Sequence, residues 1–563
     1  ELIVREILSS FNRETSGVYQ AALLIALSSI LAKILALYRD RLLASVFGAG
    51  ETLDIYFAAF RVPDFLYSIS LIIATNVAIM PILMRKENQG HDAARIFISR
   101  ISSLFVVAVG AVILAAFFLM PHISELIAPG FSAASSDKLV VLSRILLLSP
   151  LLLGFSALVS SVLQAHNRFF IFALSPVLYN AGIISGILFF YPKMGFSGLA
   201  WGVILGAFLH LLVQIPSVVS IGVFPIPTFR IFNRDILDVF KFSTPRSLGL
   251  GFNQVVLIAL TAIASAIGSG SIAIFQLAYN LFGIPLGVIG LSYSVAAFPA
   301  LARSFADGKK DEFVEGVVSS LRHIIFWSLP FVVIFIVLRA HIVRVILGAG
   351  SFGWADTRMT AAALGLFSVS ILAQGIILLL VRAFYAAGRT ALPLVVNAIS
   401  GLFTIIIALG ALYVFEVNSS LRFFEKSILR VEDLAQTSVL VLVVAFSVGN
   451  VVNAILLWMG FNRVFKTLDG QLLRSSLQGV FSALILGATS YVTLRLTDGF
   501  FDLQTFAGVF LHGATAAVSG LILTIIYLWF SGNREMRDVI DVFHHKFWKS
   551  EVVAPDPRSA IEG

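Results

Sequence analysis

The sequence predicts an all-α polytopic membrane protein with about 14 transmembrane helices. Of its 563 residues, 58% are hydrophobic and only 12% are charged, whereas soluble domains are about 25% charged. Apolar stretches of about 20 residues, each long enough to cross a ~30 Å hydrocarbon core, recur along nearly the whole chain. An internal repeat groups them into two lobes of six helices, followed by two C-terminal helices.

The apolar stretches also give the order of the predicted spans. The first stretch is too long and too charged at its far end for a cleavable signal peptide, so we interpret it as a retained first span. The predicted spans are 19–38, 54–84, 94–120, 139–164, 170–191, 197–224, 239–267, 271–301, 314–338, 357–387, 391–415, 437–463, 472–494 and 503–530.

Alternate connections between these spans are rich in basic residues. The positive-inside rule therefore predicts that this set of connections and both termini are cytoplasmic. The formal net charge of +8 then reflects cytoplasmic loops and does not indicate nucleic-acid binding. Arg422, Lys426 and Arg430 lie on the opposite side. The basic set is Arg85, Lys86, Arg168, Arg230, Arg234, Arg303, Lys309, Lys310, Arg389, Arg463 and Lys466.

The repeat appears in two pairs of similar segments. "PILMRKENQG" from Pro81 and "PALARSFADG" from Pro299 share Pro-x-Leu-x-Arg-x4-Gly, and "PVLYNA" at Pro176 recurs as "PLVVNA" at Pro393. Each copy holds an even number of spans, which predicts two lobes related by a pseudo-two-fold axis along the membrane normal, as in many transporters. The predicted parts are an N-terminal lobe at 1–224, a C-terminal lobe at 225–463, two extra transmembrane helices at 464–530 and a cytoplasmic tail with an amphipathic helix at 531–563.

Several ionisable residues lie inside the predicted spans. Such a residue costs ~2.5–3.5 kcal/mol on insertion scales, so it usually faces a cavity or a partner. Lys33 and Asp40 are two helical turns apart and share one face of the first span. We predict that this face, together with Arg39 and Arg61, lines a water-accessible cavity.

Other interpretations of these charges remain open. Arg39 and Arg41 can reach the membrane surface with their long side chains, and Arg61 can pair with Asp64 one turn further on. Asp54 is a candidate acid for ion coupling and equally a candidate structural partner of Arg39.

Other motifs restrict the chemistry. The chain has no cysteine, so disulfides and thiolate chemistry are excluded. Its nine histidines form no HExxH motif, and we predict no metal site and no cofactor. Gly-Ala-Gly at 48–50 and 348–350 lacks the Lys-Ser/Thr of a P-loop, so energy must come from an Na⁺ or H⁺ gradient, the membrane potential or the substrate gradient. We assign turn or hinge roles to Gly48, Gly50, Pro63 and Pro285.

One long stretch resembles the MurJ (MviN) lipid II flippases of the multidrug/oligosaccharidyl-lipid/polysaccharide exporter superfamily. It reads "KILALYRDRLLASVFGAGETLDIYFAAFRVPDFL" from Lys33, and is followed by "PILMRKENQG", "APGF" at Ala128, "ALSPVLYNAG" at Ala173 and "RAFYAAGRTALP" at Arg382. The resemblance implies a 14-helix inner-membrane protein that moves an undecaprenyl-pyrophosphate-linked peptidoglycan precursor outward by alternating access. It also implies a headgroup cavity with Lys33, Arg39, Asp40, Asp54 and Arg61, where Lys33 replaces the usual arginine.

The chain departs from the family pattern at several cavity positions. Tyr67 and Ser68 stand where the family has paired arginines, and Ile72 replaces a glutamate. Asn280 and Gly283 replace an arginine and a glutamate of the eighth span. Since pyrophosphate is recognised mainly through contacts with arginine and lysine, these changes predict a less cationic cavity.

Three interpretations of the function therefore remain open. The first is a lipid II flippase, not an enzyme, whose partners are an anionic lipid-linked saccharide, membrane lipids and cell-wall synthesis proteins. The second keeps the fold and changes the cargo to a different lipid-linked saccharide or an amphipathic molecule. The third class is a non-transporting scaffold, or a polytopic glycosyltransferase that uses Asp40 and Asp54 as acid and base.

Overall fold

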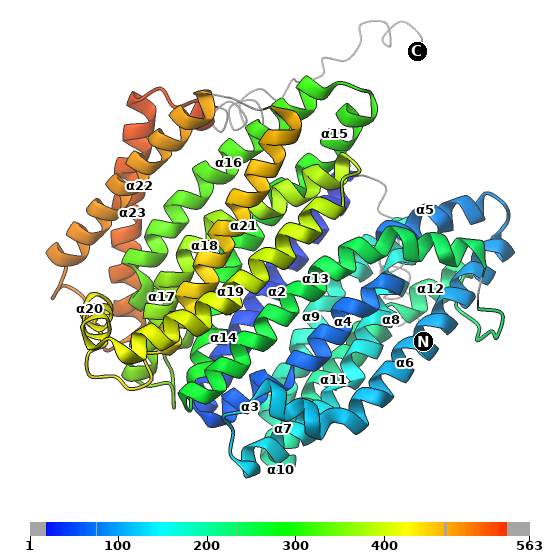
Figure 1. The fold of residues 1–563 in the computed structure, drawn as a ribbon, viewed down its shortest axis with the longest axis horizontal. Coiled ribbons are helices and arrows are strands. Elements are labelled where there is room, and N and C mark those ends of the chain that lie inside the picture. Colours follow the sequence, from blue (N-terminus) through cyan, green and yellow to red (C-terminus); the bar gives the residue numbers. More distant parts are fainter. Residues whose placement is uncertain (1–17, 75, 232, 467–469, 538–563) are drawn as a thin grey trace, which may run out of the picture.

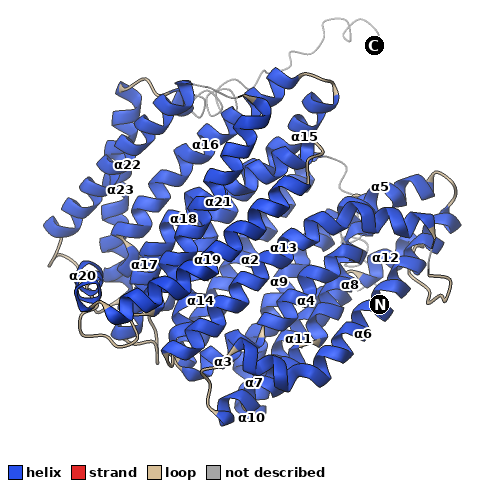
Figure 2. Ribbon diagram, in the orientation of Figure 1, coloured by secondary structure: helices blue, strands red, loops and turns tan. Residues whose placement is uncertain are grey.

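The computed structural model consists of consecutive helices joined by short loops (Figure 1). It describes residues 18–74, 76–231, 233–466 and 470–537. No strand occurs in these ranges (Figure 2). Thirteen helical segments within them are long and apolar enough to cross a membrane, and α2 (Val18–Phe47), with 30 residues, corresponds to the predicted first span. The predicted fold class is confirmed. The predicted tail helix falls mostly at 538–563, outside the described residues.

The first helix group, α2 to α12, holds the first six predicted spans. Within it α9 packs on α2 and on α11, and α8 packs on α4 and α11. Glycines bring α9 and α11 together, because a Cβ at Gly182 would lie 2.3 Å from Gly206 Cα. The remaining bounds are α3 (Glu51–Ala59), α4 (Arg61–Ala74), α5 (Asn76–Glu87), α6 (His91–Ile127), α7 (Ala133–Leu146), α8 (Leu148–Ala165), α9 (Phe169–Ser185), the π-helix η1 (Gly186–Phe190), α10 (Tyr191–Met194), α11 (Phe196–Leu212) and α12 (Ile215–Ile221).

The second helix group, α13 to α21, is built around α18, which packs against α14, α16 and α21. Rings fill this centre, and Phe282 stacks on Phe367 with centroids 5.4 Å apart. The bounds are α13 (Arg234–Ile267), α14 (Ser271–Leu286), the π-helix η2 (Gly287–Leu291), α15 (Ser292–Ala306), α16 (Lys310–Val337), α17 (Arg339–Leu347), α18 (Trp354–Ala386), α19 (Ala391–Val417), α20 (Ser419–Leu429) and α21 (Val439–Phe465).

The two groups meet at one end of the bundle and along α4 and α13. The Ser351 amide donates to the Ser45 carbonyl at 2.8 Å. Gly270 has φ +88°, and a Cβ there would lie 2.3 Å from the Ala49 carbonyl oxygen. We call this end, residues 45–50, 265–273 and 345–356, the sealed end. Toward the opposite end α15 lies apart from α5 (Figure 1), while the start of α13 stays on α5, where Asp235 pairs with Arg85 and Lys86.

Helix bounds differ from the predicted spans at several places. The first helix continues to Phe47 instead of ending near residue 38, because Arg39, Asp40 and Arg41 all find partners inside the protein. The second span is covered by α3 and α4, which are separated by a one-residue turn at Phe60, and by α5. The predicted loop 416–436 contains the amphipathic helix α20, which Asn418 caps by accepting from two backbone amides.

The two extra helices, α22 (Gly470–Leu496) and α23 (Phe506–Phe530), pack on each other. They dock onto the second group through α22 on α16 and α23 on α17. His341 of α17 and His512 of α23 form a hydrogen bond of 3.1 Å. Burial, reinforced by the neighbouring His512, lowers the pKa of His341 to about 4.

This histidine pair predicts that the protein loses stability in mild acid. Between pH 6.5 and about 4 the unfolded chain binds more protons at His341 than the folded chain does, so stability falls as the pH falls through that window. Thermal unfolding in detergent should show a lower midpoint at pH 5 than at pH 7, and the decrease should be smaller in His341→Gln. The exposed His122 offers the control His122→Gln, which should behave as the wild type. An equal decrease in all three proteins would contradict the assignment.

Candidate functional site

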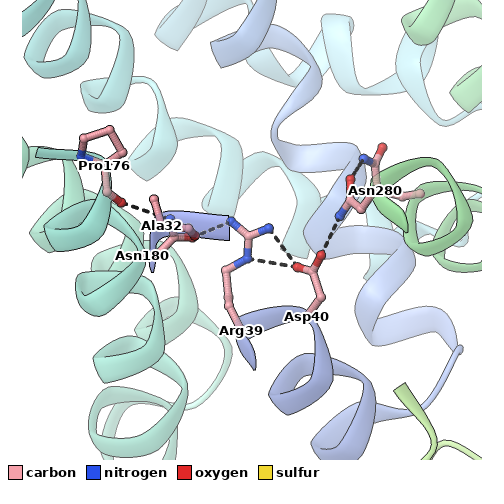
Figure 3. A network of polar contacts seen from close by, with 7 residues as sticks. Ala32, Arg39, Asp40, Pro176, Asn180 and Asn280 are labelled. Atoms are coloured by element: carbon pink, nitrogen blue, oxygen red, sulfur yellow. Dashed lines mark hydrogen bonds and ion pairs between the residues drawn. The ribbon is translucent and has the colours of Figure 1, made fainter. Parts of the chain in front are cut away.

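A charged pair in the C-terminal third of α2, Arg39 and Asp40, faces both helix groups (Figure 3). Arg39 donates to Asp40 Oδ1 from Nε at 2.9 Å and from Nη2 at 2.8 Å. Its Nη1 donates to Asn180 Oδ1 of α9 at 3.2 Å, while Asn180 Nδ2 donates to the Pro176 carbonyl. The Arg39 side chain is 20% exposed and that of Asp40 is 4% exposed. The pair is therefore held in place by the first helix group and shielded from solvent.

Asp40 continues the polar contacts into the second helix group. Its Oδ2 accepts from Asn280 Nδ2 of α14 at 3.0 Å, and Asn280 Oδ1 accepts from Gln276 Nε2 at 2.7 Å. Arg61 of α4 then donates to Gln276 Oε1 and to Thr261 Oγ1 of α13, each at 2.7 Å. We call this chain of contacts, from Asn180 through Arg39, Asp40, Asn280, Gln276 and Arg61 to Thr261, the polar layer. It crosses between the helix groups three times.

Lys33 lies two turns from Asp40 and is exposed. A Cβ at Gly287 of η2 would lie 3.7 Å from Lys33 Nζ, so Lys33 lies opposite Gly287 as Asp40 lies opposite Asn280. Each step is seven residues, which means that one face of α2 runs antiparallel to one face of α14 and η2. A Cβ at Gly283, between these two positions, would meet no atom within 4 Å. Open space therefore adjoins the face that Lys33 and Asp40 share.

Arg61 and Asp54 lie in different surroundings from Lys33. Arg61 is 4% exposed and bonds neutral side chains of the second group, and no hydrogen bond or ion pair to Asp64 is seen. Asp54 is buried and accepts from the Gly270 and Ala273 amides at 2.5 and 2.7 Å. It caps the start of α14 at the sealed end, where a carboxylate is favoured by the helix dipole. It does not pair with Arg39.

The predicted turn residues serve the ends and bends of helices. Gly48 has φ +65°, and a Cβ there would lie 2.9 Å from the Ser351 carbonyl oxygen at the sealed end. Gly50 precedes α3 with extended backbone. Pro63 lies in the first turn of α4, where its missing N–H costs nothing. Pro285 lies inside α14 just before η2, and a π-turn is a common site of helix bending.

Arg41 and Ser68 both bond backbone carbonyl groups of the protein. Arg41 donates to the Val345 and Ile346 carbonyls at the C-terminal end of α17, where a cation is stabilised, so it contacts protein and not only the membrane surface. Ser68 is buried and its hydroxyl donates to the Asp64 carbonyl. Asn180, Gln276 and Thr261 were not predicted as site residues, because neutral side chains do not stand out within an apolar span. Asn180 stands within "PVLYNA", the only signal that marked one of them.

The chain has many membrane-spanning helices in two groups, and the polar layer joins these groups. This arrangement defines a polytopic membrane transporter. The chain belongs to the lipid II flippase MurJ family, since the model of that family, described as "Lipid II flippase MurJ", matches residues 43–510. This confirms the family resemblance seen in the sequence.

Individual relatives agree with this assignment. A probable lipid II flippase MurJ of Buchnera aphidicola (subspecies Acyrthosiphon pisum) is 32% identical over 376 residues, which is 66% of this chain and 73% of that protein. The lipid II flippase MurJ of Burkholderia cenocepacia is 25% identical over 379 residues, covering 66% of this chain and 73% of its own length.

Two solved structures share the fold. The lipid II flippase MurJ in an inward closed conformation has a TM-score of 0.71 and 23% identity, covering 92% of this chain and 100% of that one. An inward-facing multidrug resistance MATE family transporter of the MOP superfamily has a TM-score of 0.61 and 16% identity, covering 79% of this chain and 96% of that one. Both support the two-group architecture of the helices.

Proposed function

We propose that this protein is a flippase for lipid II, a lipid-linked peptidoglycan precursor with an anionic headgroup, and that it works by alternating access. The observation that carries the proposal is the exposed Lys33, which lies beside open space at Gly283 and two turns from the polar layer. We propose lipid II as the cargo because the relatives are named as lipid II flippases. Cell-wall synthesis proteins are proposed partners on the same ground.

The proposed orientation places both termini in the cytoplasm of a bacterium with the protein in its inner membrane. It rests on the basic connections, which include Arg85 and Lys86, and on the positive-inside rule. The sealed end then faces outward and the opposite end faces the cytoplasm. This conformation is the one that would receive a substrate made inside the cell.

In the proposed mechanism the headgroup enters between the groups while its polyprenyl tail remains in lipid. Lys33 attracts the phosphates first, because it is exposed and has no bonded carboxylate in the described structure. Arg39 lies two turns deeper and is partly exposed. A phosphate that binds Arg39 would compete with the ion pair between Arg39 and Asp40. The hydrogen bond from Asn280 to Asp40, which joins the two groups, would then be weakened. Substrate binding would thereby favour parting of the groups at the sealed end.

The proposed energy source is an Na⁺ or H⁺ gradient or the membrane potential, since the sequence has no P-loop. Transport into vesicles with a defined gradient tests this. A gradient of Na⁺ or of H⁺ can be imposed separately. Collapse of the gradient that drives transport, by an ionophore, should slow transport.

The function itself is tested with Lys33 variants of the purified protein in vesicles that contain fluorescent lipid II. Lys33→Ala should lower the flipping rate at least about tenfold, because it removes a charged contact to phosphate. Lys33→Arg should retain most of the rate, since it keeps the charge. Lys138→Ala is the matched control, since Lys138 is exposed on α7, away from the polar layer. An unchanged rate in the double variant Lys33→Ala/Arg61→Ala would rule out this mechanism.

A different lipid-linked saccharide is the second candidate cargo, and the neutral residues Tyr67, Ser68 and Asn280 favour it. Complementation of cells depleted of their own lipid II flippase separates the two. Growth restored by the wild type but not by Lys33→Ala supports lipid II. Failure to restore growth, combined with flipping of another anionic lipid-linked saccharide in vesicles, supports the second cargo. If no tested anionic lipid is moved, the scaffold interpretation is favoured.

A further inference from the structure

Three arginines from separate elements near the sealed end lie within electrostatic range of a neighbour or share one hydroxyl group. Arg495, at the end of α22, donates to the Tyr491 hydroxyl from Nε at 3.3 Å and from Nη2 at 3.2 Å. Arg430, just after α20, also interacts with that hydroxyl. Arg339 begins α17 and lies within electrostatic range of Arg430. We call Arg339, Arg430 and Arg495 the arginine cluster.

The positive charge of the arginine cluster is not balanced by an ion pair. In the described part of the chain no carboxylate lies within salt-bridge distance of the three guanidinium groups. The nearby Asp433 is occupied by Arg358, at 2.7 and 2.8 Å, and Asp498 acts on Arg495 at longer range. Burial, and then the charge of Arg430, lower the pKa of Arg339 below its ordinary value. Like charges held together favour an anion between them.

The backbone fixes the position of Arg430. Arg430 has φ 59° and ψ 48°, the left-handed conformation that commonly ends a helix. Arg358 fixes the turn, because its Nε donates to the Arg430 carbonyl at 3.1 Å and its Nη2 donates to the same oxygen.

The helix that ends at Arg430 is suited to the membrane surface. On α20, Phe423 is 70% exposed and Phe424 is 64% exposed, and Leu421 and Ile428 are exposed as well. Arg422 and Lys426 occupy the same short helix. A helix with apolar and basic residues of this kind lies in the interface between headgroups and acyl chains. The arginine cluster therefore lies beside a segment that is expected to sit at headgroup depth.

We propose that the arginine cluster binds the phosphate of an anionic membrane lipid in the leaflet next to the sealed end. Guanidinium groups recognise phosphate oxygens through two parallel hydrogen bonds, which these arginines can supply. The apolar residues of α20 would meet the acyl chains of the same lipid. A bound lipid would tie α17 and α20 to α22, and α17 also holds Arg41 of α2. The inference goes beyond transport and does not depend on the cargo.

The test uses the full-length protein in an uncharged detergent, titrated by calorimetry with dioctanoyl phosphatidylglycerol. We expect Arg430→Gln/Arg495→Gln to bind this lipid at least about tenfold more weakly than the wild type. Lys138→Gln removes an exposed charge from α7, outside the arginine cluster and α20, and should bind as the wild type does. Thermal unfolding checks that each variant is folded, and Arg495→Gln alone replaces the double variant if that protein is unstable.

Two further ligands separate lipid from other sources of phosphate. Dioctanoyl phosphatidylcholine should bind much more weakly than phosphatidylglycerol, because its headgroup carries no net charge. Inorganic phosphate should compete only at concentrations far above those of the lipid. Equal binding of phosphatidylglycerol to the wild type and the arginine variants, equal binding of both lipids, or competition by phosphate at lipid concentrations would each overturn the proposal.

Discussion

Replacing Arg39 with alanine is expected to slow lipid transport at least about tenfold and to lower the unfolding temperature. The change leaves Asp40, whose side chain is 4% exposed, as a buried carboxylate without its ion-pair partner. Removal of one member of a buried pair typically costs about 3–5 kcal/mol. Thermal unfolding in detergent and lipid flipping in vesicles measure the two effects on one preparation.

A second variant separates the structural role of Arg39 from its proposed role in binding phosphate. Arg39→Ala/Asp40→Asn removes both charges and keeps an amide that can still bond Asn280. The free energy of unfolding should return toward the wild-type value because no isolated buried charge remains. Transport should stay low, because the positive group that would meet the phosphate is still missing. If transport recovers together with stability, Arg39 has only a structural role.

The fold was largely predictable, because hydrophobic length is a strong signal in a membrane protein. The shared face of Lys33 and Asp40 also followed from helical spacing, and the structure places both opposite α14 and η2. What hydropathy could not give is the path of the backbone within a span. The turn at Phe60, which ends α3 and precedes α4 inside one predicted span, leaves no periodic signal in the sequence.

The polar layer shows which site residues the sequence could not provide. Charged residues are conspicuous within apolar spans, so Arg39, Asp40 and Arg61 were found. Gln276 and Thr261 are neutral and ordinary in composition, and their importance comes from bonding Arg61 across 200 or more residues of chain. Asp54 was conspicuous for its charge alone, yet it contacts backbone amides, which no pattern of side chains reveals.

Linking the two helix groups at the sealed end is expected to abolish transport. Ser45 of α2 and Ser351, between α17 and α18, lie in different groups and share a backbone hydrogen bond of 2.8 Å. The chain has no cysteine, so Ser45→Cys/Ser351→Cys introduces the only two thiols. A short thiol cross-linker such as dibromobimane should join them. Since alternating access requires this end to open, the cross-linked protein should retain its substrate on one side of the membrane.

The controls distinguish a blocked opening from damage by the reagent. Each single cysteine variant, treated in the same way, should keep its transport rate. Ala133→Cys/Asp137→Cys places two exposed thiols one turn apart on α7, so the same reagent joins residues of one group without bridging to the other. That protein should also transport normally. Full cross-linking of Ser45→Cys/Ser351→Cys without loss of transport would mean that substrate crosses while the sealed end stays closed, and alternating access at this end would then be wrong.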